Sequence, residues 1–348
     1  MTTQTSPAAG PAGSGEGADG EGHGGGHGGG HGGSKAIIAA LLANLGIAIA
    51  KFVAFLVTGA SSMLAEAIHS LADSGNQVLL LIGGRRAKRV ATPDHPFGYG
   101  RERYIYAFIV SIVLFSVGGL FAVYEGVHKL QHPEELESPA WAIGVLLIAI
   151  VLESFSLRTA VKETGEVKSS QESYWRFIRT ARAPELPVVL LEDTAALLGL
   201  VLALLGVGTA ALTGNGIYDG VGTVAIGLLL LVVAVILALE TKSLLLGESA
   251  TPEDQRKIVA ALTDGASGLS VIHMKTLHLG PDEVLVAAKI AVQHDDTVAA
   301  IARAIDDAER RIRAAVPIAR VIYLEPDIRR PTESPTESPT GAPGTHGV

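Results

Sequence analysis

SMLAEAIHSLADSGNQVLLLIGG, the stretch Ser62–Gly84, is long enough to cross a bilayer and yet carries a row of polar side chains. In a helix, residues spaced by three or four lie on one face, which gathers five polar residues: Glu66, His69, Asp73, Asn76 and Gln77. Such a row is costly in lipid, so it should face a protein interior or a water-filled path. Because His69 and Asp73 can both reach one ion, we predict a divalent-metal site at mid-membrane.

The composition is that of a membrane protein with a soluble portion. Hydrophobic residues make up 48% of the 348 residues and charged residues only 18%, which suits a purely soluble protein less well. The chain has no cysteine, so disulfides and thiolate metal sites are excluded, and any metal must be bound by histidine and carboxylate ligands. The net charge of -8 does not indicate nucleic-acid binding.

Six apolar segments are expected to be transmembrane helices: Ala36–Val57, Ser62–Gly84, Tyr104–Val127, Trp141–Val161, Leu186–Leu212 and Gly220–Glu240. The loop 85–103 and the connector 162–185 are rich in Arg and Lys, and the positive-inside rule therefore places both loops and both termini in the cytoplasm. The chain is thus predicted to be an α-helical polytopic protein of the cell membrane.

The first two segments are joined by about four residues and should form a tight antiparallel hairpin. Counting from this turn, Lys51 lies at the depth of Glu66 to Ile68. We predict a Lys51–Glu66 ion pair inside the bundle. The alternative is that Lys51 extends its ammonium group to a membrane interface.

The C-terminal part has the composition of a soluble α+β domain. Thr251 is the expected N-cap of a helix with Pro252 at its first position. Two strand-like runs, a helix and a third strand-like run follow, so the order αββαβ predicts a small open sandwich. The chain then divides into a disordered tail (1–34), a transmembrane domain (35–246), a cytoplasmic domain (247–328) and a second disordered tail (329–348).

The N-terminal tail contains GHGGGHGGGHGG, with His23, His27 and His31 at a regular spacing of four residues. A flexible imidazole tract can capture Zn²⁺ or a similar ion weakly. The alternative is a solubilising tail without a metal-binding role.

Several of these features together resemble the cation diffusion facilitators, a family of zinc transporters. They are the six spans, the histidine-rich tail, HSLAD (His69–Asp73), HPFGYGRER (His95–Arg103) and a ferredoxin-like αββαβ domain, and the similarity covers about Ser34–Asp327. The resemblance implies a homodimeric, proton-coupled antiporter that exports Zn²⁺ or a related ion by alternating access.

The resemblance also implies a ligand set, with one pair four residues apart on the second helix and another on the fifth. His69 and Asp73 match the first pair and Asp193 matches one member of the second, but Val189 stands where a ligand is usual. The run LLEDTAA resembles the divergent branch that includes the vertebrate zinc transporter 9. We favour Glu192 as the missing ligand, reached by its longer side chain or through a distortion near Pro187. Three protein ligands plus water are the alternative.

The soluble domain departs from the family pattern as well. Well-studied members bind further Zn²⁺ there, but the corresponding positions look like Lys289 and Tyr323, with only Glu325 retained. We expect the domain to dimerise without the full cytoplasmic zinc cluster. We expect surface or structural roles, rather than ligand roles, for His273, His278 and His294.

One imidazole with two or three carboxylates favours Zn²⁺, Co²⁺ or Fe²⁺ over Mg²⁺ or Ca²⁺, and it leaves Mn²⁺ open. Metal binding needs deprotonated ligands and releases protons, so the predicted cycle is an antiport with His69 as the proton carrier. For Glu153 we expect a helix contact or a lining role and not a role as a metal ligand. For Asp219 we expect a cap or a rim position at the external end of a helix. His95 is expected either at the cytoplasmic entrance or in a structural role in its loop, and Tyr99 and Arg101 as ties to the soluble domain.

Two other classes of function compete with transport. A membrane-anchored metal sensor or scaffold would need no charged stripe at mid-depth in two spans, so we rank it second. An intramembrane metalloprotease is not expected, because the chain lacks HExxH and any other paired-histidine signature with a base. The chain is therefore expected to be a transporter and not an enzyme. The expected partners are a divalent ion, protons, membrane lipid and a second copy of the chain.

Overall fold

The computed structural model describes residues 32–133, 135–264 and 269–328, with side chains from Asn44 onward. Met1–Ala40 and Leu41–Val348 form separate units, and every contact reported below lies within the second. The predicted tail histidines, His23, His27 and His31, lie outside the described residues, as does the C-terminal tail from residue 329.

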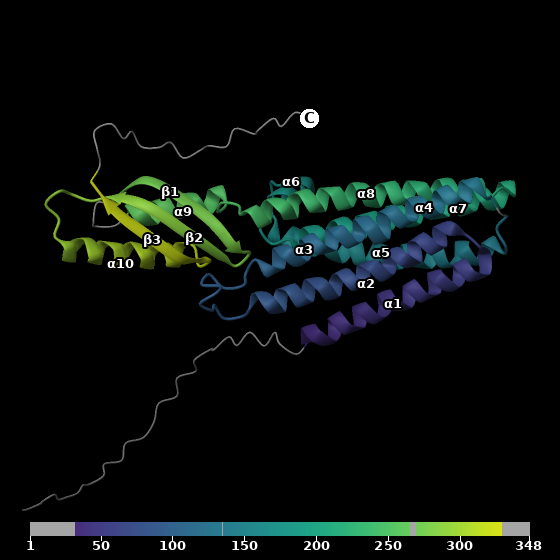
Figure 1. Ribbon diagram of the computed structural model, residues 1–348, viewed down its shortest axis with the longest axis horizontal. Helices are drawn as coiled ribbons and strands as arrows, with labels where there is room; N and C mark the ends of the chain where they lie inside the picture. The colour runs from purple at the N-terminus through teal and green to yellow at the C-terminus, as the bar shows by residue number, and fades with distance from the viewer. Residues whose placement is uncertain (1–31, 134, 265–268, 329–348) are drawn as a thin grey trace, which may run out of the picture. The chain divides into compact units, whose positions relative to one another are not determined.

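The first part of the described chain is a bundle of long helices (Figure 1). Its elements are α1 (Gly32–Thr58), α2 (Ser61–Ala87), a continuous third run made of α3 (Glu102–Val113), a π-helical segment (Leu114–Leu120) and α4 (Phe121–Gln131), then α5 (Pro139–Val167), α7 (Glu185–Thr213) and α8 (Ile217–Leu246). The basic connector contains a short helix, α6 (Tyr174–Thr180), which the sequence analysis did not predict.

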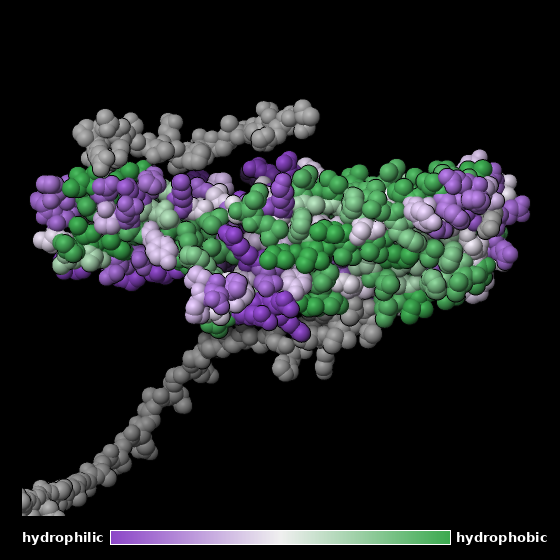
Figure 2. Space-filling view, in the orientation of Figure 1, coloured by the Kyte–Doolittle hydropathy of each residue, from purple (hydrophilic) through white to green (hydrophobic). Residues whose placement is uncertain are grey.

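Four helical runs are long and apolar enough to cross a membrane: 102–131, 139–167, 185–213 and 217–246. The part of α1 whose side chains are described, Asn44–Thr58, is apolar but shorter, and α2 is of spanning length but interrupted by its polar face. Hydrophobic residues cover the visible side of the bundle between hydrophilic residues at its two ends (Figure 2). Large apolar side chains such as Ile148 and Leu239 are 65% and 60% exposed, as expected of helices that face lipid.

The helix α8 lies at the centre of the packing, since it contacts α2, α3, α4 and α7. Its contact with α4 depends on glycine. A Cβ atom on Gly227 would lie 2.6 Å from the backbone nitrogen of Val123, so only glycine allows this approach of the two backbones. The tight packing holds α2 against α7, which matters for the site below.

The predicted hairpin of α1 and α2 is confirmed. It turns at Gly59, whose φ of +63° favours glycine. The carboxylate of Asp219 in α8 accepts hydrogen bonds from the backbone N–H groups of Ser61 (2.7 Å) and Ser62 (3.3 Å) and from both hydroxyls. Asp219 is therefore a cap, as predicted, although it caps the start of α2 from a neighbouring helix.

The soluble domain has the predicted order αββαβ: α9 (Pro252–Thr263), β1 (Ser270–Gly280), β2 (Glu283–Ala291), α10 (Val298–Ala315) and β3 (Ala319–Asp327). The sheet has the order β1-β2-β3, with β2 antiparallel to β1 and parallel to β3. Since α9 contacts β1, α10 contacts β3 and the helices contact each other, both lie on one face of the sheet. Thr251 is the N-cap of α9, and its hydroxyl accepts from the Asp254 N–H.

Candidate metal centre

The polar row on α2 is buried. Glu66 and Asn76 are fully buried and His69 is 1% exposed, as expected because these polar side chains would be costly in lipid. The stripe therefore faces the bundle interior, as predicted from its spacing. Gly199 of α7 leaves room for it, because a Cβ atom there would lie 2.7 Å from Glu66 Oε1.

The predicted ion pair between α1 and α2 is confirmed. Lys51 Nζ donates to Glu66 Oε2 at 2.9 Å and to Ser70 Oγ at 2.8 Å, and both ionic partners are buried. The alternative, in which Lys51 reaches an interface, does not occur. The pair lies one helical turn from His69 and fixes α1 against the polar face of α2.

His69 and Asp73 approach each other along α2. Nε2 of His69 lies 3.5 Å from Asp73 Oδ2. Neither ring nitrogen of His69 has a hydrogen-bond partner among the described residues, and Oδ1 of Asp73 has none either. Two strong ligand groups are therefore held side by side with unused lone pairs or protons, which is uncommon for buried polar atoms.

On α7, Glu192 and Asp193 line the same cavity as Asp73 of α2. Asn76 Nδ2 of α2 donates to Glu192 Oε1 at 2.8 Å, and Ser156 Oγ of α5 donates to Asp193 Oδ2 at 2.9 Å. The helix is α-helical from Glu185 to Thr213, so Glu192 reaches the site without the distortion near Pro187 that was one of the two expected routes.

These side chains enclose a small cavity of about 30 Å³ between α1, α2, α5 and α7. A single water needs roughly 10–15 Å³ by a comparable measure, so the cavity suits one ion or a few small ligand atoms. The lining residues are Asn44, Ile47, Ser70, Asp73, Gln77, Glu153, Ser156, Val189, Glu192 and Asp193.

The structure thus brings together three of the four predicted ligands, Asp73, Glu192 and Asp193, on the cavity wall. His69 is not on that wall but lies beside Asp73. Within the described part of the chain, no group of three or more His, Asp or Glu residues is already assembled at metal-binding distance.

The sequence predicts only one of the two α5 residues that line the cavity. Glu153 lines the cavity, in agreement with the lining role that the sequence suggested, whereas Ser156 was not singled out. Its position three residues after Glu153 places it on the same helix face, and this spacing is the signal that could have identified it.

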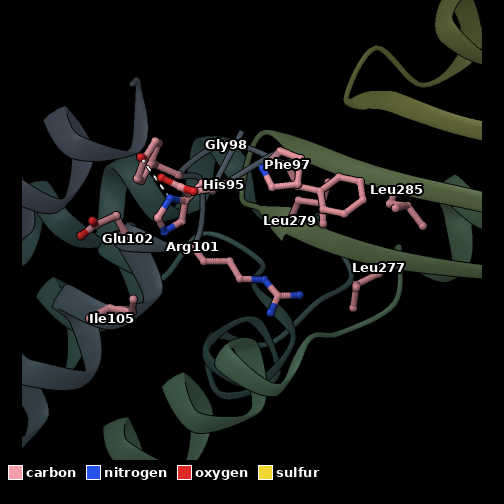
Figure 3. A pocket seen from close by; sticks show the side chains of 12 residues that line it. His95, Phe97, Gly98, Arg101, Glu102, Ile105, Leu277, Leu279 and Leu285 are labelled. Atoms are coloured by element: carbon pink, nitrogen blue, oxygen red, sulfur yellow. Dashed lines mark hydrogen bonds between the residues drawn. The ribbon is translucent and has the colours of Figure 1, made fainter. Parts of the chain in front are cut away.

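A larger pocket of about 490 Å³ lies where the loop after α2 meets β1 and β2. In Figure 3, His95, Phe97 and Arg101 come from the loop, and Leu277, Leu279 and Leu285 come from the strands. His95 Nδ1 is 3.2 Å from the Tyr99 hydroxyl, so His95 has a structural role in its loop.

Tyr99 and Arg101, the predicted ties to the soluble domain, line this pocket together with Leu277 of β1. Arg103 in the first turn of α3 adds an ion pair with Asp282 at 2.7 Å. Arg103 also pairs with Glu185 at the start of α7.

In the soluble domain, the acidic groups of β3 next to Lys289 are already paired. Lys289 donates to Asp327 at 3.0 Å and lies 3.3 Å from Glu325. The ammonium group of Lys289 is therefore paired with both carboxylates. His278 is buried, and its Nδ1 donates to the Gly280 carbonyl at 3.1 Å, in agreement with a structural role. Burial lowers the pKa of His278 below its ordinary value of 6.5.

Comparison with known proteins gives a consistent result. The family model of the cation efflux transmembrane domain matches residues 37–246. The human protein named proton-coupled zinc antiporter SLC30A9, mitochondrial, is 35% identical over 241 residues, which cover 69% of this chain and 42% of that protein. Metal tolerance protein C4 of Arabidopsis thaliana is 28% identical over 260 residues, covering 74% of this chain and 56% of that protein.

One bacterial relative matches this chain over most of the relative's own length. The cation-efflux pump FieF of Pectobacterium atrosepticum is 26% identical over 296 residues, or 82% of this chain and 90% of that protein. The chain spans less than half the length of the human SLC30A9 protein. The matched residues contain α2, α5, α7 and the whole cavity, so the chain belongs to the cation efflux, or cation diffusion facilitator, family of membrane transporters and resembles its SLC30A9 branch.

Proposed function

We propose that this protein exports a divalent cation, with Zn²⁺ as the principal substrate, in exchange for protons. The observation that carries the proposal is the cavity inside the bundle. Its wall holds the carboxylates of Asp73, Glu192 and Asp193, and the buried imidazole of His69 lies beside it. An ionisable group at membrane depth is a strong sign of an ion path, and four such groups on two helices strengthen it.

The donor chemistry supports Zn²⁺. Zn²⁺ accepts four ligands from imidazole nitrogen and carboxylate oxygen when thiolates are absent, and this chain has no cysteine. His69 can supply the nitrogen, and Asp73, Glu192 and Asp193 supply the oxygens. An imidazole ligand disfavours Mg²⁺ and Ca²⁺, which prefer oxygen alone, whereas Mn²⁺, Fe²⁺ and Co²⁺ remain compatible.

Proton coupling follows from the same ligands. Carboxylate and imidazole groups bind a metal ion only when they are deprotonated, so the ion displaces protons on binding. If protons from the opposite side of the membrane then bind these groups, they expel the ion and complete an exchange. His69 is the expected carrier, because imidazole ordinarily titrates near neutral pH.

The proposed orientation places both termini in the cytoplasm of a cell-membrane protein. The basic loops 85–103 and 162–185 support it through the positive-inside rule. The αββαβ domain is proposed to dimerise two copies, with each bundle switching between access from the two sides. A membrane-anchored metal sensor is the competing function.

The proposal is tested by Zn²⁺ uptake into proteoliposomes under an imposed pH gradient. We expect uptake that depends on the gradient, that is abolished by Asp73→Ala and that is retained by the control Glu163→Ala, an exposed residue of α5. Increased uptake by Val189→His would mean that the α7 side of the site is normally incomplete, and a loss would mean that Glu192 already fills it. Absence of flux for every divalent ion, with folded protein in the vesicles, would refute transport and favour the sensor.

A further inference from the structure

The central residue of α5 carries a carboxylate that the ligand set described above does not use. Glu153 lies halfway along this 29-residue helix. Its neighbours Val151, Leu152 and Phe155 are apolar and 45–64% exposed, as expected of a helix in lipid. Glu153 instead lines the cavity between α1, α2, α5 and α7. A carboxylate at this depth is costly unless a cation or a hydrogen-bond donor compensates it.

Within the described part of the chain, Glu153 forms no hydrogen bond and no close ion pair. The other two acids on the cavity wall opposite α2 differ in this respect. Glu192 accepts from Asn76, and Asp193 accepts from Ser156. Glu153 is thus the carboxylate on this wall that is left for a ligand, and it lies on the same face of α5 as Ser156, which already reaches the site.

The residue on α7 that faces this cavity without donor atoms is Val189. Val189 lies four residues before Asp193, which is one helical turn away on the same face of α7. At the level of Val189, α7 therefore offers the cavity no ligand atom. A carboxylate from α5 can fill that gap, because both residues line the same space of about 30 Å³.

A second observation indicates a cation here. His69 is 1% exposed, and neither of its ring nitrogens has a hydrogen-bond partner among the described residues, while Nε2 lies 3.5 Å from Asp73 at the cavity wall. A metal ion would satisfy this buried imidazole and the carboxylates of the cavity together.

We propose that Glu153 is a ligand of the transported cation, so that the site is built by three helices, α2, α5 and α7. This inference rests on the proposed transport function and adds a specificity determinant to it. A further carboxylate makes the site richer in oxygen, and oxygen-rich sites accept Mn²⁺ better than sites dominated by nitrogen. Glu153 therefore broadens the substrate class from Zn²⁺ towards Mn²⁺.

The test is metal binding by the purified full-length chain in detergent, measured for Zn²⁺ and Mn²⁺ by competition with a chromophoric chelator. Glu153→Gln keeps the shape of the side chain and removes its charge. Glu163→Gln, an exposed acid ten residues further along α5, is the matched control. We expect Glu153→Gln to weaken binding of both ions by about 10-fold or more, with the larger loss for Mn²⁺, and the control to bind as the wild type does.

A double variant checks the geometry. In Glu153→Gln/Val189→His, the new imidazole lines the same cavity, so Zn²⁺ binding should recover while Mn²⁺ binding does not. A purely structural role for Glu153 would not produce this split between the two ions. If Glu153→Gln is not monodisperse, Glu153→Asp keeps the charge on a shorter side chain and should show the same preferential loss of Mn²⁺.

The outcomes separate the inference from the proposed function. Wild-type affinities for both ions in a folded Glu153→Gln or Glu153→Asp protein would overturn the role of Glu153, provided that Asp73→Ala still abolishes binding. If Asp73→Ala also binds both ions as the wild type does, the transmembrane site itself is refuted.

Discussion

Replacing Lys51 by methionine should destabilise the helix bundle strongly. Methionine keeps most of the volume and apolar stem of lysine but removes the ammonium group that donates to Glu66 at 2.9 Å and to Ser70 at 2.8 Å. Lys51 is 2% exposed and Glu66 is fully buried, so water cannot replace the lost partner.

The expected loss of unfolding free energy follows from the carboxylate of Glu66, which stays buried without its cationic partner. Breaking a buried ion pair from one side leaves an uncompensated charge and costs about 3–5 kcal/mol. Glu66 is especially sensitive, because its Oε1 atom has no hydrogen-bond partner among the described residues even in the intact pair. We therefore expect Lys51→Met to lower the free energy of unfolding by about 3–5 kcal/mol.

The double variant Lys51→Met/Glu66→Met distinguishes the lost pair from lost packing. Replacing both charges by apolar groups of similar volume is often neutral or stabilising by about 1–4 kcal/mol. The double variant should thus be more stable than Lys51→Met alone. Lys242→Met, at an exposed position near the end of α8, is the control and should change stability by less than about 0.5 kcal/mol.

The measurement is equilibrium unfolding of the purified protein by SDS in mixed micelles, followed by circular dichroism. An unfolding free energy for Lys51→Met within about 0.5 kcal/mol of the wild type would refute the buried ion pair as a stabilising contact. A double variant no more stable than the sum of its single changes would show that Lys51 and Glu66 do not interact.

Three further predictions follow from single contacts. Asp219→Ala removes the acceptor for the Ser61 and Ser62 N–H groups, should cost about 1–2 kcal/mol and should speed hydrogen exchange at the start of α2; unchanged exchange there contradicts the cap. Gly227→Ala forces a Cβ atom to 2.6 Å from the α4 backbone and should cost about 1–3 kcal/mol in the SDS assay, whereas Gly144→Ala, with open space around it, should be neutral or stabilising; equal effects would argue against the α4–α8 contact. Because burial lowers the pKa of His278, the unfolded state binds the proton more readily than the folded state does. Protection of β1 and β2 from hydrogen exchange should therefore fall as the pH drops below about 6.5. The variant His278→Gln should remove this pH dependence, and the control His294→Gln should keep it.

Local sequence patterns predict much of the fold. The long apolar runs predict the spans, and the alternation and capping residues predict the αββαβ domain, because both depend on neighbouring residues of one segment. Even the Lys51–Glu66 pair could be predicted, since a tight turn fixes the depth of residues on its two sides. The short helix α6 and the π-helical segment Leu114–Leu120 were not predicted, because they arise within segments that carry no periodic signal of their own.

The site was predicted one helix at a time. Spacing along α2 identified His69 and Asp73. The resemblance to the cation diffusion facilitators identified Asp193, and Glu192 was favoured in place of Val189. Whether these side chains share one cavity, and whether Glu192 faces it together with Asp193, was left open by the sequence.

The tertiary structure decided those points. Helical periodicity tells which residues share a face of one helix, because it is a property of the backbone alone. It does not tell which faces of different helices meet, since that depends on packing all the spans at once, with glycine contacts such as Gly227 on Val123 setting the distances. For this reason the sequence alone determined the spans, the domain order and the polar face of α2, and only the packed bundle placed Glu153 and Ser156 of α5 beside the carboxylates of α7.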